Sequence, residues 1–334
     1  MPDRSPQVSV VIVTYNCDRY LPIAVESILR QSFSDLELIV IDNASTDGSR
    51  HYLDGVRDPR LVRINNPRNG GPQAANLALP VARGRYLARL DADDVALPGR
   101  LRRQFEFMEA HPDIGLCGSA YEEIDENGKH RNQSAVVQDA AEIRWQLGWQ
   151  NFIGHSTVMA RTQLVTSLGG YREDLWCVQD YDLISRIALN SKVTMLPDCL
   201  VQYRVYSNSI THVRNEEMLR TSLQVSVSHL EKSLGATLGT NTPIAAIRIM
   251  RQLECPPDTD WQTALGLIAR YTSRHTIAMP AELGATVRLK TAEQLLRYAR
   301  AFCRDRTGVR FRFEVAILRM LPNLWIKRLR TYLN

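Results

Sequence analysis

The stretch Arg85–Pro98 reads RYLARLDADDVALP, and it decides the fold because an apolar strand ends in it directly before three closely spaced carboxylates. Tyr86–Leu90 is a short, mostly apolar run typical of a buried strand, and the proline that follows the turn favours the start of a helix. Asp91, Asp93 and Asp94 are therefore expected at a strand end, where open α/β sheets place their chemistry.

Carboxylates this close repel one another and raise one another's pKa unless a cation joins them. Hard oxygen ligands at a strand end suit Mg²⁺ or Mn²⁺ shared with phosphate oxygens. The alternative is that Asp91 and Asp94 serve only as turn and helix-capping residues, which is the commoner role of an isolated DxDD sequence. The turn predicts a metal–diphosphate site if the rest of the chain supplies a nucleotide pocket.

Composition is ordinary for a globular protein. The 334 residues are 44% hydrophobic and 23% charged, and the length fits one large α/β domain with an appendage. No apolar run approaches the roughly 20 residues of a membrane span, and the N-terminus lacks the apolar core of a signal peptide. Six scattered cysteines without a CxxC pair disfavour a zinc site or disulfide framework. We expect a cytoplasmic protein with reduced thiols.

Strands and helices alternate along the first half of the chain. Val8–Thr14 is an almost unbroken β-branched run, typical of a strand buried on both faces of a parallel sheet. Leu36–Ile41 and Leu61–Asn65 read as further strands, with a helix beginning near Leu21 and another over Gln73–Ala82. This order predicts an α/β fold with a Rossmann-like, mainly parallel sheet flanked by helices.

Polar residues follow these strands. Tyr15-Asn16, Asp42-Asn43 and the Asp turn come at three strand ends, which we expect to converge on one edge as a nucleotide pocket. A dehydrogenase would require G-x-G-x-x-G after the first strand, and VTYNCDRYL has no glycine. A GxxxxGK[ST] phosphate loop is also absent, so both commoner nucleotide folds are disfavoured.

Four blocks, in their order and spacing, resemble family 2 glycosyltransferases, which have a GT-A fold, over about residues 7–212. The blocks are VSVVIVTYN, AVESILRQSFSDLELIVIDNASTDGS, GRYLARLDADD and GGYREDLWCVQDYDL. The resemblance implies inverting transfer of a sugar from a nucleotide-diphosphate donor to an acceptor hydroxyl, assisted by a divalent cation, Mg²⁺ or Mn²⁺. A nucleotide-sugar donor and a glycan or glycolipid acceptor are the implied partners.

The resemblance also implies roles for individual residues. Tyr15 and the Asp42-Asn43 pair would line the nucleoside pocket, Asp91 would lie near the nucleoside, and Asp93 would bind the metal. The residues expected to bind the nucleotide sugar are Thr14, Tyr15, Asn16, Asp42, Asn43, Asn69, Asp91 and Ala92.

The chain departs from the family pattern at three places. Many members carry a second Asp at the position of Asn43, which can instead offer a donor and an acceptor to a pyrimidine edge, so a UDP- or dTDP-sugar is expected. Ala75-Asn76 replaces an Arg-Asn pair. Tyr206 replaces a frequent His and is a poor ligand for Mg²⁺ or Mn²⁺, so metal ligands beyond Asp93, among them His212, stay open.

The middle of the chain is expected to bind the acceptor. Ile114–Tyr121 and Phe152–Ala160 read as sheet segments, and Ala140–Leu147 as a short helix. His155 and Asp182 are candidates for contacts with the acceptor or phosphate, although a lone His in such a run is more often a hydrogen-bonded structural residue.

Asp180 is the predicted general base. Inverting transfer needs one base within hydrogen-bond reach of the attacking hydroxyl, opposite the leaving diphosphate. Asp180 matches the family's base just before an expected helix over Leu183–Leu189, but the neighbouring Glu is replaced by Gln179, so burial or Asp182 must tune its pKa. The alternative is that Asp180 caps the helix and Asp182 interacts with the helix dipole.

Beyond Asn215 the spacing is helical throughout. We expect a catalytic domain over 1–214, with a donor half to about residue 95 and an acceptor half over 96–214, and a helical region over 215–334. Arg304–Asn334 holds eight Lys or Arg against two acidic residues, a net charge of +6. This basic amphipathic tail can lie on an anionic membrane surface, or bury its apolar face on the catalytic domain.

The sequence therefore predicts a glycosyltransferase that extends a cell-envelope or exported glycan, in the cytoplasm or at the inner face of the membrane. The charge is too uneven for a nucleic-acid binder, and no motif of that class is present. A nucleotidyltransferase would be expected to show a Gly-rich phosphate loop with a basic residue after the first strand. A non-catalytic sugar-nucleotide binding subunit is disfavoured by the intact Asp93 and Asp180.

Overall fold

A computed structural model describes residues 5–206, 215–239, 241–256, 258–303, 309, 312–313 and 315–317. The chain divides into two compact units, residues 1–140 with 152–221, and residues 141–151 with 222–334. The second unit thus includes the segment 141–151, which the sequence analysis had placed in the acceptor half. His212 and nearly all of the tail beyond Cys303 lie outside the described residues.

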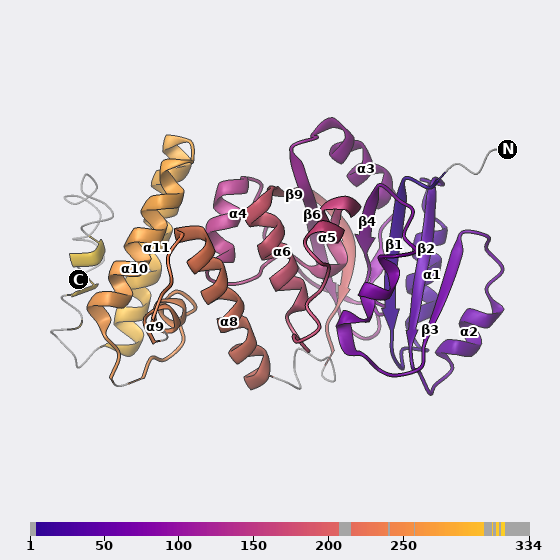
Figure 1. The fold of residues 1–334 in the computed structure, drawn as a ribbon, viewed down its shortest axis with the longest axis horizontal. Helices are drawn as coiled ribbons and strands as arrows, with labels where there is room; N and C mark the ends of the chain where they lie inside the picture. Colours follow the sequence, from indigo (N-terminus) through magenta and orange to yellow (C-terminus); the bar gives the residue numbers. More distant parts are fainter. Residues whose placement is uncertain are drawn as a thin grey trace. The chain divides into compact units, whose positions relative to one another are not determined.

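The first unit is built on one sheet, of nine strands within the described residues, in the order β3-β2-β1-β4-β8-β6-β9-β5, with β7 paired to β6 (Figure 1). β3, β2, β1 and β4 are parallel, as expected, whereas β8 is antiparallel to both β4 and β6. The strands are β1 (Val8–Thr14), β2 (Leu36–Asn43), β3 (Leu61–Asn66), β4 (Tyr86–Arg89), β5 (Val95–Ala96), β6 (Ile114–Ile124), β7 (His130–Gln133), β8 (Met159–Arg161) and β9 (Lys192–Arg204).

Helices flank this sheet, as expected. The β-branched side chains of β1 and β2 are buried together with the apolar face of α1, in which Leu21, Ala24, Val25 and Ile28 are fully buried. The helical segments are α1 (Leu21–Leu29), α2 (Ser49–Gly55), η1 (Gly71–Ala78), α3 (Arg100–Ala110), η2 (His155–Thr157), α5 (Thr162–Ser167) and α6 (Gln179–Asn190), where η marks a 3₁₀ turn.

Three segments differ from the sequence-based expectation. The helix expected over Gln73–Ala82 is the 3₁₀ segment η1, which begins at Gly71 and ends at Ala78. In Phe152–Ala160 only the last two residues belong to a strand, because η2 precedes β8. The long strand β9 was not predicted, since Pro197 interrupts its sequence; in the structure Pro197 lies at a register shift against β6, where a missing N–H is tolerated.

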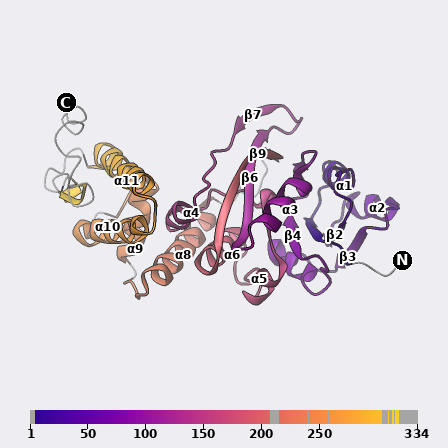
Figure 2. The same ribbon diagram turned by 90° about the horizontal axis from the view of Figure 1, so that it is seen from above.

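The second unit is helical. Figure 2 shows α9, α10 and α11 packed together, and their mutual contacts form the core of this unit. Trp145 of α4 is buried there and donates from its indole N–H to Thr272 Oγ1 of α10 at 3.2 Å. The helices are α4 (Ala140–Leu147), α8 (Asn215–Leu234), which crosses the 221/222 boundary, α9 (Asn241–Met250), α10 (Trp261–Ile277) and α11 (Ala281–Phe302).

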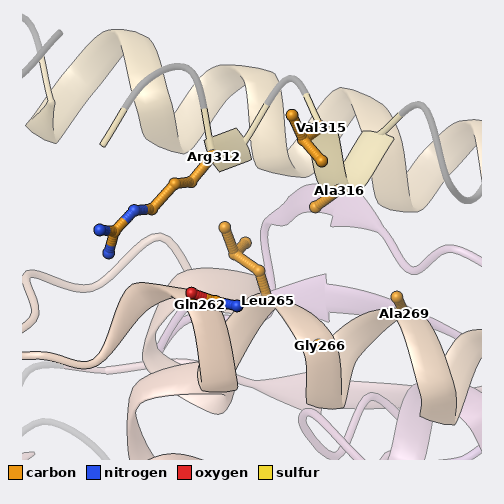
Figure 3. A pocket seen from close by; sticks show the side chains of 7 residues that line it. All are labelled: Gln262, Leu265, Gly266, Ala269, Arg312, Val315 and Ala316. Atoms are coloured by element: carbon orange, nitrogen blue, oxygen red, sulfur yellow. The ribbon is translucent and has the colours of Figure 1, made fainter. Parts of the chain in front are cut away.

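The few described residues of the tail pack within this helical unit. Phe313 is fully buried and stacks on Tyr298, with ring centroids 5.7 Å apart. A pocket of about 180 Å³ lies between α10 and this segment, with Arg312 and Gln262 beside apolar side chains (Figure 3). None of the helices in the described part of the chain combines the length and apolar character that a membrane crossing requires.

Candidate functional site

The polar strand ends meet at one edge of the sheet. In the register of the parallel strands Thr14 pairs with Asp42, and Asn43 pairs with Asn66. β4 lies on the other side of β1, so its Asp turn follows at the same edge. The convergence predicted from the sequence is present, because the carboxyl ends of parallel strands lie together.

Hydrogen bonds join the loop after β1 to the loop after β2. Asn16, in the left-handed region at φ 49°, accepts the Thr46 N–H at 2.8 Å on its Oδ1. The carboxylate of Asp42 is buried, accepting from the Ser45 N–H and from Arg50 Nε, both at 2.9 Å. Tyr15 between them has half of its surface exposed and presents an aromatic ring at this edge. The Thr14 hydroxyl is buried and finds no hydrogen-bond partner among the described residues.

Asn43 is buried, and its amide is fully hydrogen-bonded within the protein. Its Nδ2 donates to Asn69 Oδ1 at 2.9 Å and to the Gly71 carbonyl at 3.1 Å. Its Oδ1 accepts from Asn66 Nδ2 at 2.8 Å and from the Gly70 N–H at 3.1 Å. Since an amide offers two donors and two acceptor positions, none is left in this arrangement for the pyrimidine edge that the sequence suggested. Asn43 and Asn69 instead fix the loop 66–71.

Asp91 is held by two basic side chains. Arg89, buried in β4, donates to Asp91 Oδ1 at 2.9 Å, and His155 Nδ1 lies 3.6 Å from the same oxygen. Partial burial opposes ionisation of Asp91, whose side chain is 35% exposed, but His155 and Arg89 outweigh it and lower its pKa. Because Arg89 Nε and the Tyr171 hydroxyl point to His155 Nε2, at 3.3 and 2.9 Å, the ring proton is assigned to Nδ1, facing Asp91.

Asp93 has a different environment from Asp91. The Tyr206 hydroxyl donates to its Oδ2 at 3.0 Å. Burial, together with the charge of Asp91, raises the pKa of Asp93 to about 6. Next to it, the Ala92 carbonyl accepts a weak hydrogen bond from the Cys17 thiol at 3.5 Å. The DxD motif therefore contains one carboxylate that Arg89 and the ring N–H of His155 hold, and one that a cation would stabilise.

The buried carboxylate of Asp94 stabilises the turn that contains Asp91 and Asp93. It accepts from the Ser156 hydroxyl and, at 2.7 Å, from the Arg204 N–H. Arg204 Nε donates to the Asp93 carbonyl at 2.8 Å, and its guanidinium lies over the ring of Tyr20. Burial and the two neighbouring carboxylates raise the pKa of Asp94 well above its ordinary value. Asp94 is thus a structural residue of the turn, although it does not cap α3, which begins after Gly99.

Asp180 lies in the first turn of α6, whose N-cap is Val178, so Asp180 is not the capping residue. Val178 adopts φ 55°, a strained conformation for a β-branched residue, of order 1–3 kcal/mol. Asp180 lines a void of about 10 Å³, the size of one water molecule, together with Arg89, His155, Tyr171 and mostly apolar side chains of the core. The predicted base and the side chains that hold Asp91 therefore share one cavity wall.

The carboxylate of Asp182 is used within the protein. It forms an ion pair with Arg186 at 2.6 Å, and Arg172 lies 3.8 Å from its other oxygen. Arg186 in turn donates to the carbonyls of Leu168 and Gly170. Asp182 therefore braces the loop before α6, which is a different role from the acceptor or phosphate contact expected for it.

Asp93 fits one ligand position of a divalent cation. Within the described ranges, no set of three or more His, Cys, Asp or Glu side chains is placed to hold a metal ion. Mg²⁺ commonly takes only one or two carboxylates and completes its shell with substrate phosphates and water. A partly buried carboxylate with a raised pKa at a strand end suits that kind of shared site.

The sequence analysis assigned no role to three residues that build the site: Arg89, Tyr171 and Arg204. Arg89 could have been found, because it lies two residues before Asp91, and alternate residues of a strand share a face. The other two come from distant segments, and no local pattern marks them as site residues.

Comparison with known proteins identifies the family. The model of Glycosyl transferase family 2 matches residues 9–168. An uncharacterized glycosyltransferase of Methanocaldococcus jannaschii is 35% identical over 222 residues, covering 64% of this chain and 76% of that protein. The chain belongs to glycosyltransferase family 2. A second relative, from Escherichia coli, is named UDP-Glc:alpha-D-GlcNAc-diphosphoundecaprenol beta-1,3-glucosyltransferase; it is 30% identical over 222 residues, covering 64% of this chain and 84% of its own length.

Solved structures confirm the family's GT-A fold, a mixed α/β sheet with flanking helices and a helical C-terminal region. TarS of S. aureus in complex with UDP-GlcNAc aligns with a TM-score of 0.59 at 18% identity, covering 93% of this chain and 90% of that one. A mannosyltransferase of Pyrobaculum calidifontis with GDP-Man and Mn²⁺ gives a TM-score of 0.54 at 20% identity, covering 98% and 89%.

Proposed function

We propose that this chain is an inverting glycosyltransferase that moves one sugar from a nucleoside-diphosphate donor to a hydroxyl of a cell-envelope or exported glycan. The observation that supports this most directly is the Asp turn at the end of β4. Asp91 is kept ionised by Arg89 and His155, whereas burial raises the pKa of Asp93 to about 6 beside it. A cation that arrives with a diphosphate would neutralise such a carboxylate.

Asp93 would hold a divalent cation, Mg²⁺ or Mn²⁺, together with the donor. When bound, the cation supplies charge neutralisation for the departing diphosphate. Arg204 and Ser156 keep the turn in place through Asp94, so the Asp93 carboxylate is fixed before the donor arrives. The mannosyltransferase structure that contains Mn²⁺ supports a cation in a protein of this fold.

Asp180 is the proposed general base. It takes the proton of the acceptor hydroxyl while that oxygen attacks the anomeric carbon, and the bond from this carbon to the diphosphate oxygen breaks. The configuration inverts because attack and departure occur on opposite faces. The position of Asp180 in the first turn of α6, close to His155 and Tyr171, supports this role, since it brings the carboxylate near the side chains that hold Asp91.

The donor is proposed to be a UDP- or dTDP-sugar. The half-exposed ring of Tyr15 is suited to packing on the base, and Asn43 holds the adjacent loop. The names of the Escherichia coli relative and of the TarS complex include UDP-sugars, which favours uracil. The bound GDP-Man of the mannosyltransferase makes a guanine nucleotide the control to include.

The acceptor is proposed to be lipid-linked. The name of the Escherichia coli relative specifies a diphosphoundecaprenol-linked acceptor. The +6 charge of Arg304–Asn334 suits reversible contact with the anionic inner face of a membrane, at about 1 kcal/mol per basic residue near the surface. The buried Phe313 shows that the described part of this tail also packs within the helical unit.

The test is a screen of UDP-, dTDP- and GDP-sugars for thermal stabilisation, each with and without Mn²⁺. A ligand of the folded state raises the apparent stability, by about 2.7 kcal/mol at a concentration 100 times its dissociation constant. We expect a Mn²⁺-dependent shift with one nucleotide, and its loss in Asp93→Ala. Absence of a shift with every donor would contradict the proposal, and an unchanged shift in Asp93→Ala would contradict the metal assignment.

A further inference from the structure

One side chain of η1 holds the main chain that leads to the predicted base. Asn76 Oδ1 accepts the Tyr171 N–H at 2.8 Å, and Asn76 Nδ2 donates to the Tyr171 carbonyl at 2.7 Å. Two hydrogen bonds from one planar amide fix both the position and the orientation of the residue they bind. We call this pair of bonds between Asn76 and Tyr171 the clamp. The contact depends on Gly170, at φ 65°, because a Cβ there would lie 2.6 Å from Asn76 Oδ1.

Tyr171, the residue that Asn76 holds, is also connected to Asp91 through His155. The Tyr171 hydroxyl donates to His155 Nε2 at 2.9 Å, and His155 Nδ1 faces Asp91. Burial raises the pKa of Tyr171 to about 12, so the hydroxyl keeps its proton and remains a donor. The position of Tyr171 therefore depends on Asn76 at its main chain and on the His155–Asp91 pair at its side chain.

The same segment is also tied to the helix that carries the base. Arg186 of α6, paired with Asp182, donates to the Leu168 and Gly170 carbonyls at 2.7 and 2.6 Å. Residues 168–171 are thus held by η1 on one side and by α6 on the other. η1 itself begins at Gly71, whose carbonyl and N–H are bonded by Asn43 and Asn69.

We propose that Asn76 is a positioning residue of the reaction, which couples the donor-binding loop 66–71 to the segment 168–178 that places Asp180. The proposal deepens the function proposed above and depends on it. A donor that orders loop 66–71 and η1 also orders segment 168–178 through Asn76, so the base takes its position once the donor is bound. Loss of the clamp then lowers turnover more than donor affinity, because Asp91 keeps its bond to Arg89 and loop 66–71 keeps its bonds to Asn43 when Tyr171 moves.

Two variants break the clamp from opposite sides. Asn76→Asp keeps the size and the acceptor but loses the donor, so a carboxylate oxygen faces the Tyr171 carbonyl. Gly170→Ala forces the same peptide away from Asn76 through the added Cβ. The matched control is Asn132→Asp, on the exposed strand β7, whose amide donates to Glu123 at 3.1 Å.

The experiment is hydrogen–deuterium exchange of the full chain with Mn²⁺ and UDP, dTDP or GDP, together with the rate of donor hydrolysis. In the wild type and in Asn132→Asp, we expect the bound nucleotide to protect residues 42–71 and also 168–178. In both clamp variants protection of 42–71 stays, protection of 168–178 is lost, and kcat falls about 10- to 100-fold with KM for the donor nearly unchanged.

The outcomes separate this inference from the proposed function. If a nucleotide protects 42–71 in the wild type but never 168–178, the coupling is refuted while the donor site stands. If the clamp variants weaken donor binding and leave kcat unchanged, Asn76 belongs to the donor site instead. If none of the three nucleotides protects either segment, the proposed function fails, and the coupling fails with it.

Discussion

The substitution Asn43→Asp tests what holds loop 66–71 in place. It keeps the size of the side chain and the acceptor positions for Asn66 Nδ2 and the Gly70 N–H. It removes the two bonds that Asn43 donates, to Asn69 Oδ1 at 2.9 Å and to the Gly71 carbonyl at 3.1 Å. A carboxylate oxygen then faces two acceptors in a buried site, which is unfavourable for the closed loop.

The magnitude follows from those two contacts. An unmade buried hydrogen bond costs about 1–3 kcal/mol, so keeping loop 66–71 in place would cost about 2–6 kcal/mol in the variant. The loop avoids this cost by detaching. Part of the binding free energy of the donor must then be used to return the loop to its place. We expect the donor dissociation constant to rise by about 30-fold or more, since every 1.4 kcal/mol is a factor of ten. The melting temperature of the first unit should change little, because Asn43 is the last residue of β2 and the apolar side chains of the sheet are unchanged.

The assay compares nucleotide affinity and hydrogen exchange of residues 66–71 in the wild type, in Asn43→Asp and in Asn65→Asp. Asn65 is exposed on β3 and serves as the matched control. A loop-holding role weakens UDP, dTDP and GDP by the same factor, whereas a base-reading amide changes the preference among them. Unchanged affinity together with unchanged exchange in Asn43→Asp would refute our interpretation of the network.

Three other perturbations probe the base, the helical unit and the tail. Asp180→Asn should lower turnover about 10²-fold at nearly constant donor affinity, and a loss of affinity without loss of kcat would instead indicate a binding role. Burial lowers the pKa of His229 to about 3 and of His275 to about 4 from 6.5. Between these pKa values only the unfolded chain binds the two protons, so the free energy of unfolding of the helical unit should fall as pH drops from 6.5 to about 4. The fall is up to about 1.4 kcal/mol per pH unit for each His. A free energy of unfolding that stays constant over this pH range would contradict this prediction. The double variant Lys327→Glu/Arg328→Glu should reduce salt-sensitive co-sedimentation of the full chain with anionic liposomes, and equal, negligible binding by both proteins would leave the tail a packing element.

The first strands and the Asp turn could be predicted because their signals are local. β1 matches its predicted bounds, and β2 extends only two residues beyond them, to Asn43. β-Branched runs specify buried parallel strands by themselves, and parallel pairing brings their ends together without further information. The resemblance to family 2 rests on short sequence blocks at these strand ends, which are local signals too, and the comparisons confirmed it.

The hydrogen-bond networks could not be predicted, because they join segments far apart in the chain. Asn43 looks like a base reader until Asn66, Asn69 and the loop glycines are placed around it. β9 was missed because Pro197 ordinarily excludes a strand, and only the register shift against β6 makes room for it. Asp91 and Asp93 likewise look alike in the sequence, but His155 and Arg89, on η2 and β4, lower the pKa of Asp91, whereas burial and the charge of Asp91 raise the pKa of Asp93.

The placement of residues 141–151 in the second unit has a consequence for synthesis and for engineering. The polypeptide passes between the two units at 140/141, 151/152 and 221/222, the last time inside α8. On the ribosome, α4 emerges well before α10, the helix that accepts its Trp145 hydrogen bond, so the helical unit can be completed only after the first unit has been synthesised. A chimera that exchanges the helical unit between family members must therefore transplant 141–151 along with 222–334, since a single junction would leave α4 facing foreign partners.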